Sequence, residues 1–116
     1  MVRKPNEQAV KYNEKMRGGE GVVKAVAMLS AEEMYNKGRL YSKLILPPGA
    51  SIGYHAHENE MEAFVVAEGG GEYYDDGTFI RLSAGDVTLT VSGQGHSVKN
   101  DTDADLVLLA LILHKN

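Results

Sequence analysis

The feature that most constrains the fold is the regular alternation of short apolar segments and turn residues from residue 39 to the last residue of the sequence. Each segment is four to eight residues long and is separated from the next by Gly, Pro, Asn or Asp residues. Such segments are typical of β-strands, and the Asp76-Gly77 pair indicates a hairpin. We therefore expect an all-β fold in which antiparallel strands form a small double-sheet barrel. The expected strands are residues 40–46, 51–57, 62–67, 71–74, 78–82, 86–91, 96–100 and 106–113.

Residues 1–38 are expected to form an N-terminal arm beside the barrel of residues 39–116. The start of the arm is polar and ends in a glycine-containing stretch, which is typical of an extended segment. Residues 22–28 are rich in valine and alanine and predict a strand. Ser30 and Glu33 have the spacing of a capping box, so a short helical turn is expected to complete the arm.

Composition and charge narrow the class of protein. The net charge of −4 argues against nucleic-acid binding, which needs clustered Lys and Arg. The sequence has no cysteine, so disulfides, thiolate metal sites and cysteine nucleophiles are excluded. The N-terminus lacks the apolar core of a signal peptide, and the longest apolar run, residues 106–113, is too short to span a membrane. We expect a cytoplasmic protein with neither a nucleic-acid nor a membrane partner.

Residues 53–64 contain the strongest candidate site, because two of the four histidines of the chain stand one residue apart there. Residues i and i+2 of a strand point to the same face, so His55 and His57 project together. Glu62 begins the next expected strand, and an antiparallel hairpin would return it beside these histidines. His96 opens a later strand and can supply a third imidazole. Three histidines and one carboxylate form a mixed nitrogen and oxygen site for a divalent transition metal.

Other interpretations of these residues stay open on this reasoning alone. A histidine pair on a strand also occurs without a metal, and His96 by itself can be a core or turn histidine. Glu58 and Glu60 compete with Glu62 for the role of ligand, although both are more typical of solvated loop carboxylates. His114 has no partner pattern, and we assign it no role.

Two longer motifs contain the four candidate residues. The first is Gly, five residues, His-x-His, four residues, Glu, six residues and Gly. The second begins with Gly and continues, after five residues, with Val-x-Gly, two residues, His, three residues and Asn. Both resemble the characteristic motifs of the cupin superfamily, except that Val91 stands where the family usually has a proline that shapes a turn. The matching residues are Gly49, His55, His57, Glu62, Gly69, Gly85, Gly93, His96 and Asn100.

The resemblance implies a small single-domain cupin with a jelly-roll-like barrel and a metal inside it. It assigns the metal ligands as His55, His57, Glu62 and His96. Within the family, the branch of oxalate decarboxylase and oxalate oxidase is similar in this ligand set, and manganese is the usual metal there. One divalent metal per chain is therefore expected, manganese first, with iron, nickel and zinc also compatible.

Strand parity predicts which residues line the cavity around the metal. Ser51 and Gly53 are expected to share the face of His55, and Phe64 is expected to share the face of Glu62. The other expected lining residues are Leu40, Ser42, Leu44, Leu46, Val66 and Val98.

Two functions fit this site, because cupins include both enzymes and binding proteins. The first is a metal-dependent decarboxylase or oxidoreductase acting on a small oxygen-rich organic acid such as oxalate. The second is a non-catalytic module that binds or senses a small carboxylate or sugar. The catalytic residues stay unknown, and the candidates for a general acid or base are the loop carboxylates Glu58 and Glu60. Residues 106–113 are apolar on both faces, which predicts a homodimer with the N-terminal arm across the partner.

Overall fold

The computed structural model describes residues 1–116 and contains ten β-strands and two short 3₁₀ turns. The strands lie close to the expected ranges, because apolar alternation and turn residues determine where they begin and end. The elements are η1 (Pro5–Glu7), β1 (Val10–Glu14), η2 (Met16–Gly18), β2 (Val22–Leu29), β3 (Gly38–Leu46), β4 (Ser51–Ala56), β5 (Glu60–Glu68), β6 (Gly70–Asp75), β7 (Thr78–Ser83), β8 (Val87–Thr90), β9 (Gly95–Lys99) and β10 (Leu106–His114). None of its helical segments has the length and apolar character needed to cross a membrane.

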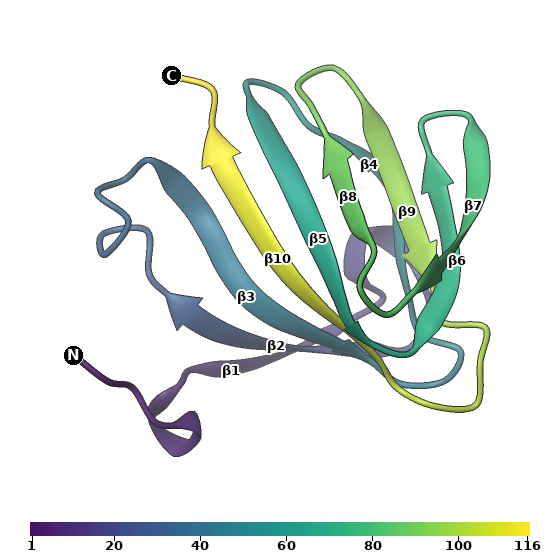
Figure 1. The fold of residues 1–116 in the computed structure, drawn as a ribbon, viewed down its shortest axis with the longest axis horizontal. Helices are drawn as coiled ribbons and strands as arrows, with labels where there is room; N and C mark the ends of the chain where they lie inside the picture. Colours follow the sequence, from purple (N-terminus) through teal and green to yellow (C-terminus); the bar gives the residue numbers. More distant parts are fainter.

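The strands form two antiparallel sheets that face each other (Figure 1). The larger sheet has six strands in the order β1-β2-β3-β10-β5-β8, and the smaller has four in the order β4-β9-β6-β7. In Figure 1, β10 lies between β3 and β5, while the N-terminal strands β1 and β2 form one edge of the same sheet. The prediction of an all-β fold with two antiparallel sheets is confirmed.

The last strand, β10, shows how the core is built. Its residues alternate between buried and half-buried along its length, as expected for a strand with one face against the opposite sheet. The buried residues are Leu106, Leu108, Ala110 and Ile112. The half-buried residues are Val107, Leu109, Leu111 and Leu113. Within a single chain, one apolar face of β10 is therefore covered and the other remains partly open.

The helical turn expected at the end of the N-terminal arm forms only a series of turns. The capping box is made, because Ser30 N–H donates to Glu33 Oε1 at 2.9 Å and Glu33 N–H donates to Ser30 Oγ at 3.1 Å. One helical hydrogen bond follows, from Met34 N–H to Ser30 O at 3.2 Å. Tyr35 and Asn36 then have φ angles of 55° and 56°. These left-handed conformations end the helical path before a helix is established.

A bulge in β4 changes which residues line the interior. The register between β4 and β9 shifts between Ile52 and His55, because β4 contains one more residue there than β9 does. Ile52 is 2% exposed and lines the same cavity as His55, whereas Ser51 and Gly53 line a hollow elsewhere. The expectation that Ser51 and Gly53 share the cavity face of His55 is therefore wrong, because it assumed unbroken alternation.

The turn residues of the two motifs behave as the sequence indicates. The four motif glycines at turns have φ angles between 79° and 95°, a region that glycine adopts without steric cost. Asn100 is fully buried and donates from its amide to Leu46 O at 2.8 Å and Ala104 O at 2.7 Å. Its carbonyl accepts from Thr102 N–H at 3.0 Å. Asn100 thus stabilises the turn between β9 and β10.

Candidate metal centre

The four predicted ligands come from both sheets. His55 lies on β4 and His96 on β9, and they are direct partners in the register of the smaller sheet. Glu62 lies on β5 of the larger sheet. His57 follows β4, where backbone hydrogen bonds to the turn before β9 hold it. The expected hairpin between β4 and β5 is wrong, because the connection crosses from one sheet to the other.

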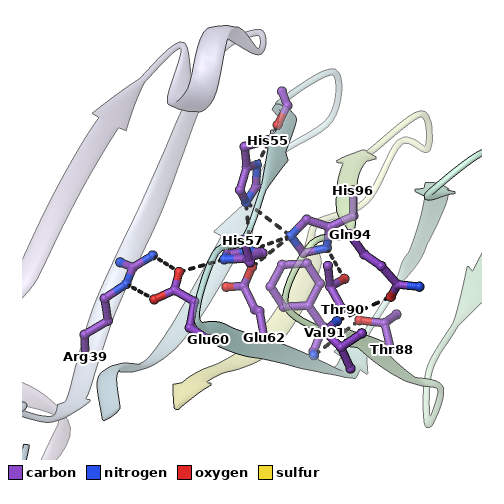
Figure 2. Close-up of polar contacts among 12 residues, drawn as sticks. Arg39, His55, His57, Glu60, Glu62, Thr88, Thr90, Val91, Gln94 and His96 are labelled. Carbon is purple, nitrogen blue, oxygen red and sulfur yellow. Dashed lines mark hydrogen bonds and ion pairs between the residues drawn. The ribbon is translucent and has the colours of Figure 1, made fainter. Parts of the chain in front are cut away.

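The side chains of these four residues point toward one another between the sheets (Figure 2). Glu62 Oε1 lies 2.9 Å from His96 Nε2, 3.0 Å from His57 Nε2 and 3.7 Å from His55 Nε2. His96 Nε2 also lies 3.1 Å from His55 Nε2 and 3.2 Å from His57 Nε2. One nitrogen or oxygen atom of each residue lies within 4.8 Å of the others. The structure therefore brings all four predicted residues together around one point.

Hydrogen bonds on the far side of two rings determine which nitrogen atoms carry hydrogen. Gly53 O lies 2.8 Å from His55 Nδ1, and Glu60 Oε1 lies 2.8 Å from His57 Nδ1. A carbonyl and an ionised carboxylate only accept, so each Nδ1 donates and each Nε2 presents a lone pair. These lone pairs face Glu62, which is another acceptor. Acceptors at such separations repel one another unless a cation lies between them, so this donor set fits a metal ion.

The ionisation of the buried groups agrees with this arrangement. Burial raises the pKa of Glu62, but the three imidazoles around the carboxylate outweigh burial and lower its pKa to about 2. Burial lowers the pKa of His96, although Glu62 opposes this shift. At neutral pH the carboxylate is therefore ionised and the His96 imidazole is neutral, and these are the forms that bind metal ions.

An ion pair behind His57 was not predicted from the sequence. Arg39 on β3 donates two hydrogen bonds, both of 2.8 Å, to the carboxylate of Glu60, which accepts from His57 Nδ1 (Figure 2). The hydrogen bonds from Arg39 lower the pKa of Glu60 to about 2 despite partial burial. The interpretation of Glu60 as a solvated loop carboxylate is wrong, since its side chain is 12% exposed and lies on β5. Its spacing of two residues from Glu62 on one strand was the signal that could have identified it.

His96 is held by a second set of contacts that the sequence did not indicate. Its Nδ1 lies 2.7 Å from the Tyr73 hydroxyl and 3.0 Å from Thr90 Oγ1, and both residues are almost fully buried. The ring of Phe64 stacks on the imidazole, with centroids 5.2 Å apart and planes inclined by 18°. These contacts fix the orientation of the ring, which a metal ligand requires.

A small cavity of about 60 Å³ opens at the cluster and is lined by His55, His57 and Glu62. Leu40, Leu44 and Phe64 line it as predicted. The lining residues that were not predicted are Met16, Arg17, Arg39, Ile52 and Ile112. The remaining predicted lining residues, which are buried but do not line this cavity, are Ser42, Leu46, Val66 and Val98. A larger hollow of about 290 Å³ beside β7 and β8 contains no comparable group of converging side chains.

Comparison with known proteins agrees with the motifs and the geometry. The family model described as "Cupin domain" matches residues 42–112. A relative named oxalate-binding protein, from Thermotoga maritima, is 42% identical over 113 residues, which are 97% of this chain and 93% of that protein. The crystal structure of a predicted oxalate decarboxylase from Thermotoga maritima is 41% identical, with a TM-score of 0.94 over 98% of this chain and 99% of that chain.

A more distant structure is similar in fold alone. The cupin domain of Schizosaccharomyces pombe Cnp3 is 16% identical, with a TM-score of 0.73 over 91% of this chain and 69% of that chain. The two-sheet arrangement is thus found where little of the sequence is shared. Because the family model spans more than half of the chain, and a relative at 42% identity matches nearly all of it, the chain belongs to the cupin family.

Proposed function

We propose that this cupin binds a divalent transition metal and holds a small dicarboxylate such as oxalate on it. The proposed metal ligands are His55, His57, Glu62 and His96. The observation that carries the proposal is the convergence of three imidazoles and one ionised carboxylate beside a cavity. The 42% identical relative named oxalate-binding protein supports the class of small molecule. Manganese is the first candidate metal, and iron, nickel and zinc are also compatible with this donor set.

The charges at the site favour an anionic small molecule. A divalent cation with one carboxylate and three neutral imidazoles leaves a net positive charge. Arg17 and Arg39 also line the cavity, although Glu60 balances the charge of Arg39. A dianion that offers two oxygen atoms to the metal complements this field. When bound, the metal supplies Lewis acidity and a template that orients the small molecule.

The size of the cavity favours a molecule of few atoms. Its volume is about 60 Å³, whereas a cavity needs about 10–15 Å³ to hold one water molecule. Pockets for drug-sized molecules are larger, at about 300–1,000 Å³. A small dicarboxylate therefore fits the cavity better than a sugar, the other ligand class considered for a binding module.

The lining residues favour binding over turnover. Decarboxylation of oxalate to formate and CO₂ needs a proton delivered to the carbon atom that loses CO₂. Glu62 is the only carboxylate that lines the cavity, and it is a proposed metal ligand. Glu60 is held by Arg39, and Glu58 is exposed and lies outside the cavity lining. Turnover is the second candidate function, supported by the 41% identical structure described as a predicted oxalate decarboxylase.

The proposed function is tested by titrating oxalate into metal-loaded protein in a calorimeter while formate, CO₂ and H₂O₂ are measured. We expect one oxalate to bind per chain only when the metal is present, with no product formed. Protein treated with a chelator is the matched control. If the protein with one metal per chain does not bind oxalate, the proposal is contradicted. If formate or H₂O₂ accumulates, the function is turnover instead of binding.

We further propose that two chains form a homodimer through the outer face of the larger sheet. Leu109, Val65 and Val87 stand in register across β10, β5 and β8, and Leu89 lies two residues beyond Val87 on the same face of β8. Val65, Val87 and Leu89 are 38%, 68% and 55% exposed. An apolar surface that spans neighbouring strands marks an interaction site.

Leu89→Glu is expected to convert the dimer to a monomer of 12.6 kDa, because it places a charge in the apolar interface. Light scattering at micromolar concentration measures the mass. Phe79→Glu, at an exposed position of the smaller sheet, is the control and is expected to stay dimeric. A monomeric parent protein would contradict the proposal.

A further inference from the structure

We propose that Arg17 binds the two oxygen atoms of the dicarboxylate that face away from the metal, and so selects dicarboxylates over monocarboxylates. The inference rests on the proposed function and extends it to the N-terminal arm, outside both cupin motifs. Arg17 lines the same cavity as His55, His57 and Glu62, although it lies at least 38 positions from them in the sequence.

Two glycines allow the η2 turn, which contains Arg17, to lie directly against β4. A side chain at Gly53 would collide with the carbonyl oxygen of Arg17, and a side chain at Gly19 would collide with the backbone of Ser51. Glu20 N–H donates to Ser51 Oγ at 2.8 Å, and Ser51 N–H donates to Glu20 O at 2.9 Å. The turn is therefore held in place beside the strand that carries the first metal-binding histidine.

The backbone of η2 adopts a conformation that few residues accept. Lys15 and Arg17 have φ angles of 48° and 55°, in the left-handed region that side chains other than glycine seldom occupy. Such conformations persist where the surroundings fix them, and they are common at ligand sites. Met16 stands between these two residues in the sequence, and its side chain packs against the hydrophobic core. The core contact of Met16 thus anchors the turn while Arg17 lines the cavity.

The donors of Arg17 are available to a ligand. Arg17 has no partner among the ion pairs and side-chain hydrogen bonds, whereas Arg39, the other cation of the cavity, makes two hydrogen bonds to Glu60. Oxalate that chelates a metal through one oxygen of each carboxylate leaves two oxygen atoms side by side on the opposite edge. A guanidinium has paired N–H donors that match such a pair of oxygen atoms.

The test compares oxalate with glycolate, which also chelates through two oxygen atoms but leaves only one on the outward edge. Calorimetric titration of metal-loaded Arg17→Gln is expected to show oxalate binding about 10- to 100-fold weaker than in the parent protein, the range of a lost charge-assisted contact. Glycolate binding should weaken much less. Arg17→Lys keeps the charge but loses the paired donors, so its oxalate affinity should lie between the two.

Lys15→Gln is the matched control, because it removes the same charge beside the same turn from a residue that does not line the cavity. It should bind oxalate like the parent protein, and every variant should retain one metal per chain. Equal oxalate affinity in the parent protein and Arg17→Gln, or equal losses in Arg17→Gln and Lys15→Gln, would overturn the role of Arg17 alone. If the metal-loaded parent protein does not bind oxalate, the proposed function and the role of Arg17 are both overturned.

Discussion

Glu62→Gln is expected to abolish stable metal binding while leaving the fold intact. The substitution keeps the size of a side chain that is 4% exposed and removes the only carboxylate of the cluster. The new amide can donate to the Nε2 lone pair of His57, which lies 3.0 Å from the Glu62 carboxylate, so the metal-free protein keeps a polar contact there. Metal affinity should fall by more than about 100-fold, because removing groups that merely support a ligand already costs about 10–100-fold. Calorimetric titration with manganese and metal analysis of the purified protein measure the loss.

The control for this experiment is Glu58→Gln, which makes the same chemical change on an exposed residue in the loop between β4 and β5. It should bind metal as the parent protein does. An unchanged affinity in Glu62→Gln would remove the carboxylate from the proposed ligand set. A parent protein that accepts no divalent metal would contradict the metal site as a whole.

Phe64→Ala is expected to lower the free energy of unfolding by about 3–5 kcal/mol, the usual cost of removing a large buried aromatic side chain. Phe64 is 1% exposed, belongs to the central core cluster and stacks on His96. The change leaves a cavity, which the surrounding structure relaxes to fill only in part. The loss is a large part of the roughly 5–15 kcal/mol that stabilises a typical domain. Urea unfolding of the metal-free protein, at one fixed protein concentration, measures the effect without a contribution from metal binding.

The chain has one other phenylalanine, and it provides the matched control. Phe79 lies on β7 and is 66% exposed, so Phe79→Ala should change the free energy of unfolding by much less. Similar losses in the two variants would show that burial in this core does not determine the contribution of a phenylalanine.

Local patterns predict the strands of this protein well but predict side-chain placement less well. Apolar alternation and turn residues identify most strand ranges, because both signals lie within the strand or in the residues directly beside it. Strand parity fails at Ile52 and Gly53, because the β4 bulge depends on how β4 pairs with the distant β9. The capping box at Ser30 forms as predicted, but the left-handed residues after it prevent a helix.

The candidate site shows the same division between local and distant information. The four proposed ligands were identifiable because they lie in motifs with fixed spacing. The contacts that support them join residues far apart in the sequence, such as Arg39 with Glu60 and Tyr73 with His96. Arg17 reaches the cavity only because η2 packs on β4. No pattern within a single segment indicates such pairings, which depend on the order of strands in the sheets.

Because the proposed ligands come from both sheets, metal binding affects the stability of the protein and its resistance to proteolysis. His55 and His96 belong to one layer and Glu62 to the other, so an ion that engages all of them acts as a cross-link through the middle of the molecule. The unfolded chain offers no comparable chelator, so occupancy selectively favours the native form, by about 2.7 kcal/mol at a metal concentration 100 times Kd. Metal scarcity would then expose the protein to proteases even while its sequence and synthesis remain unchanged.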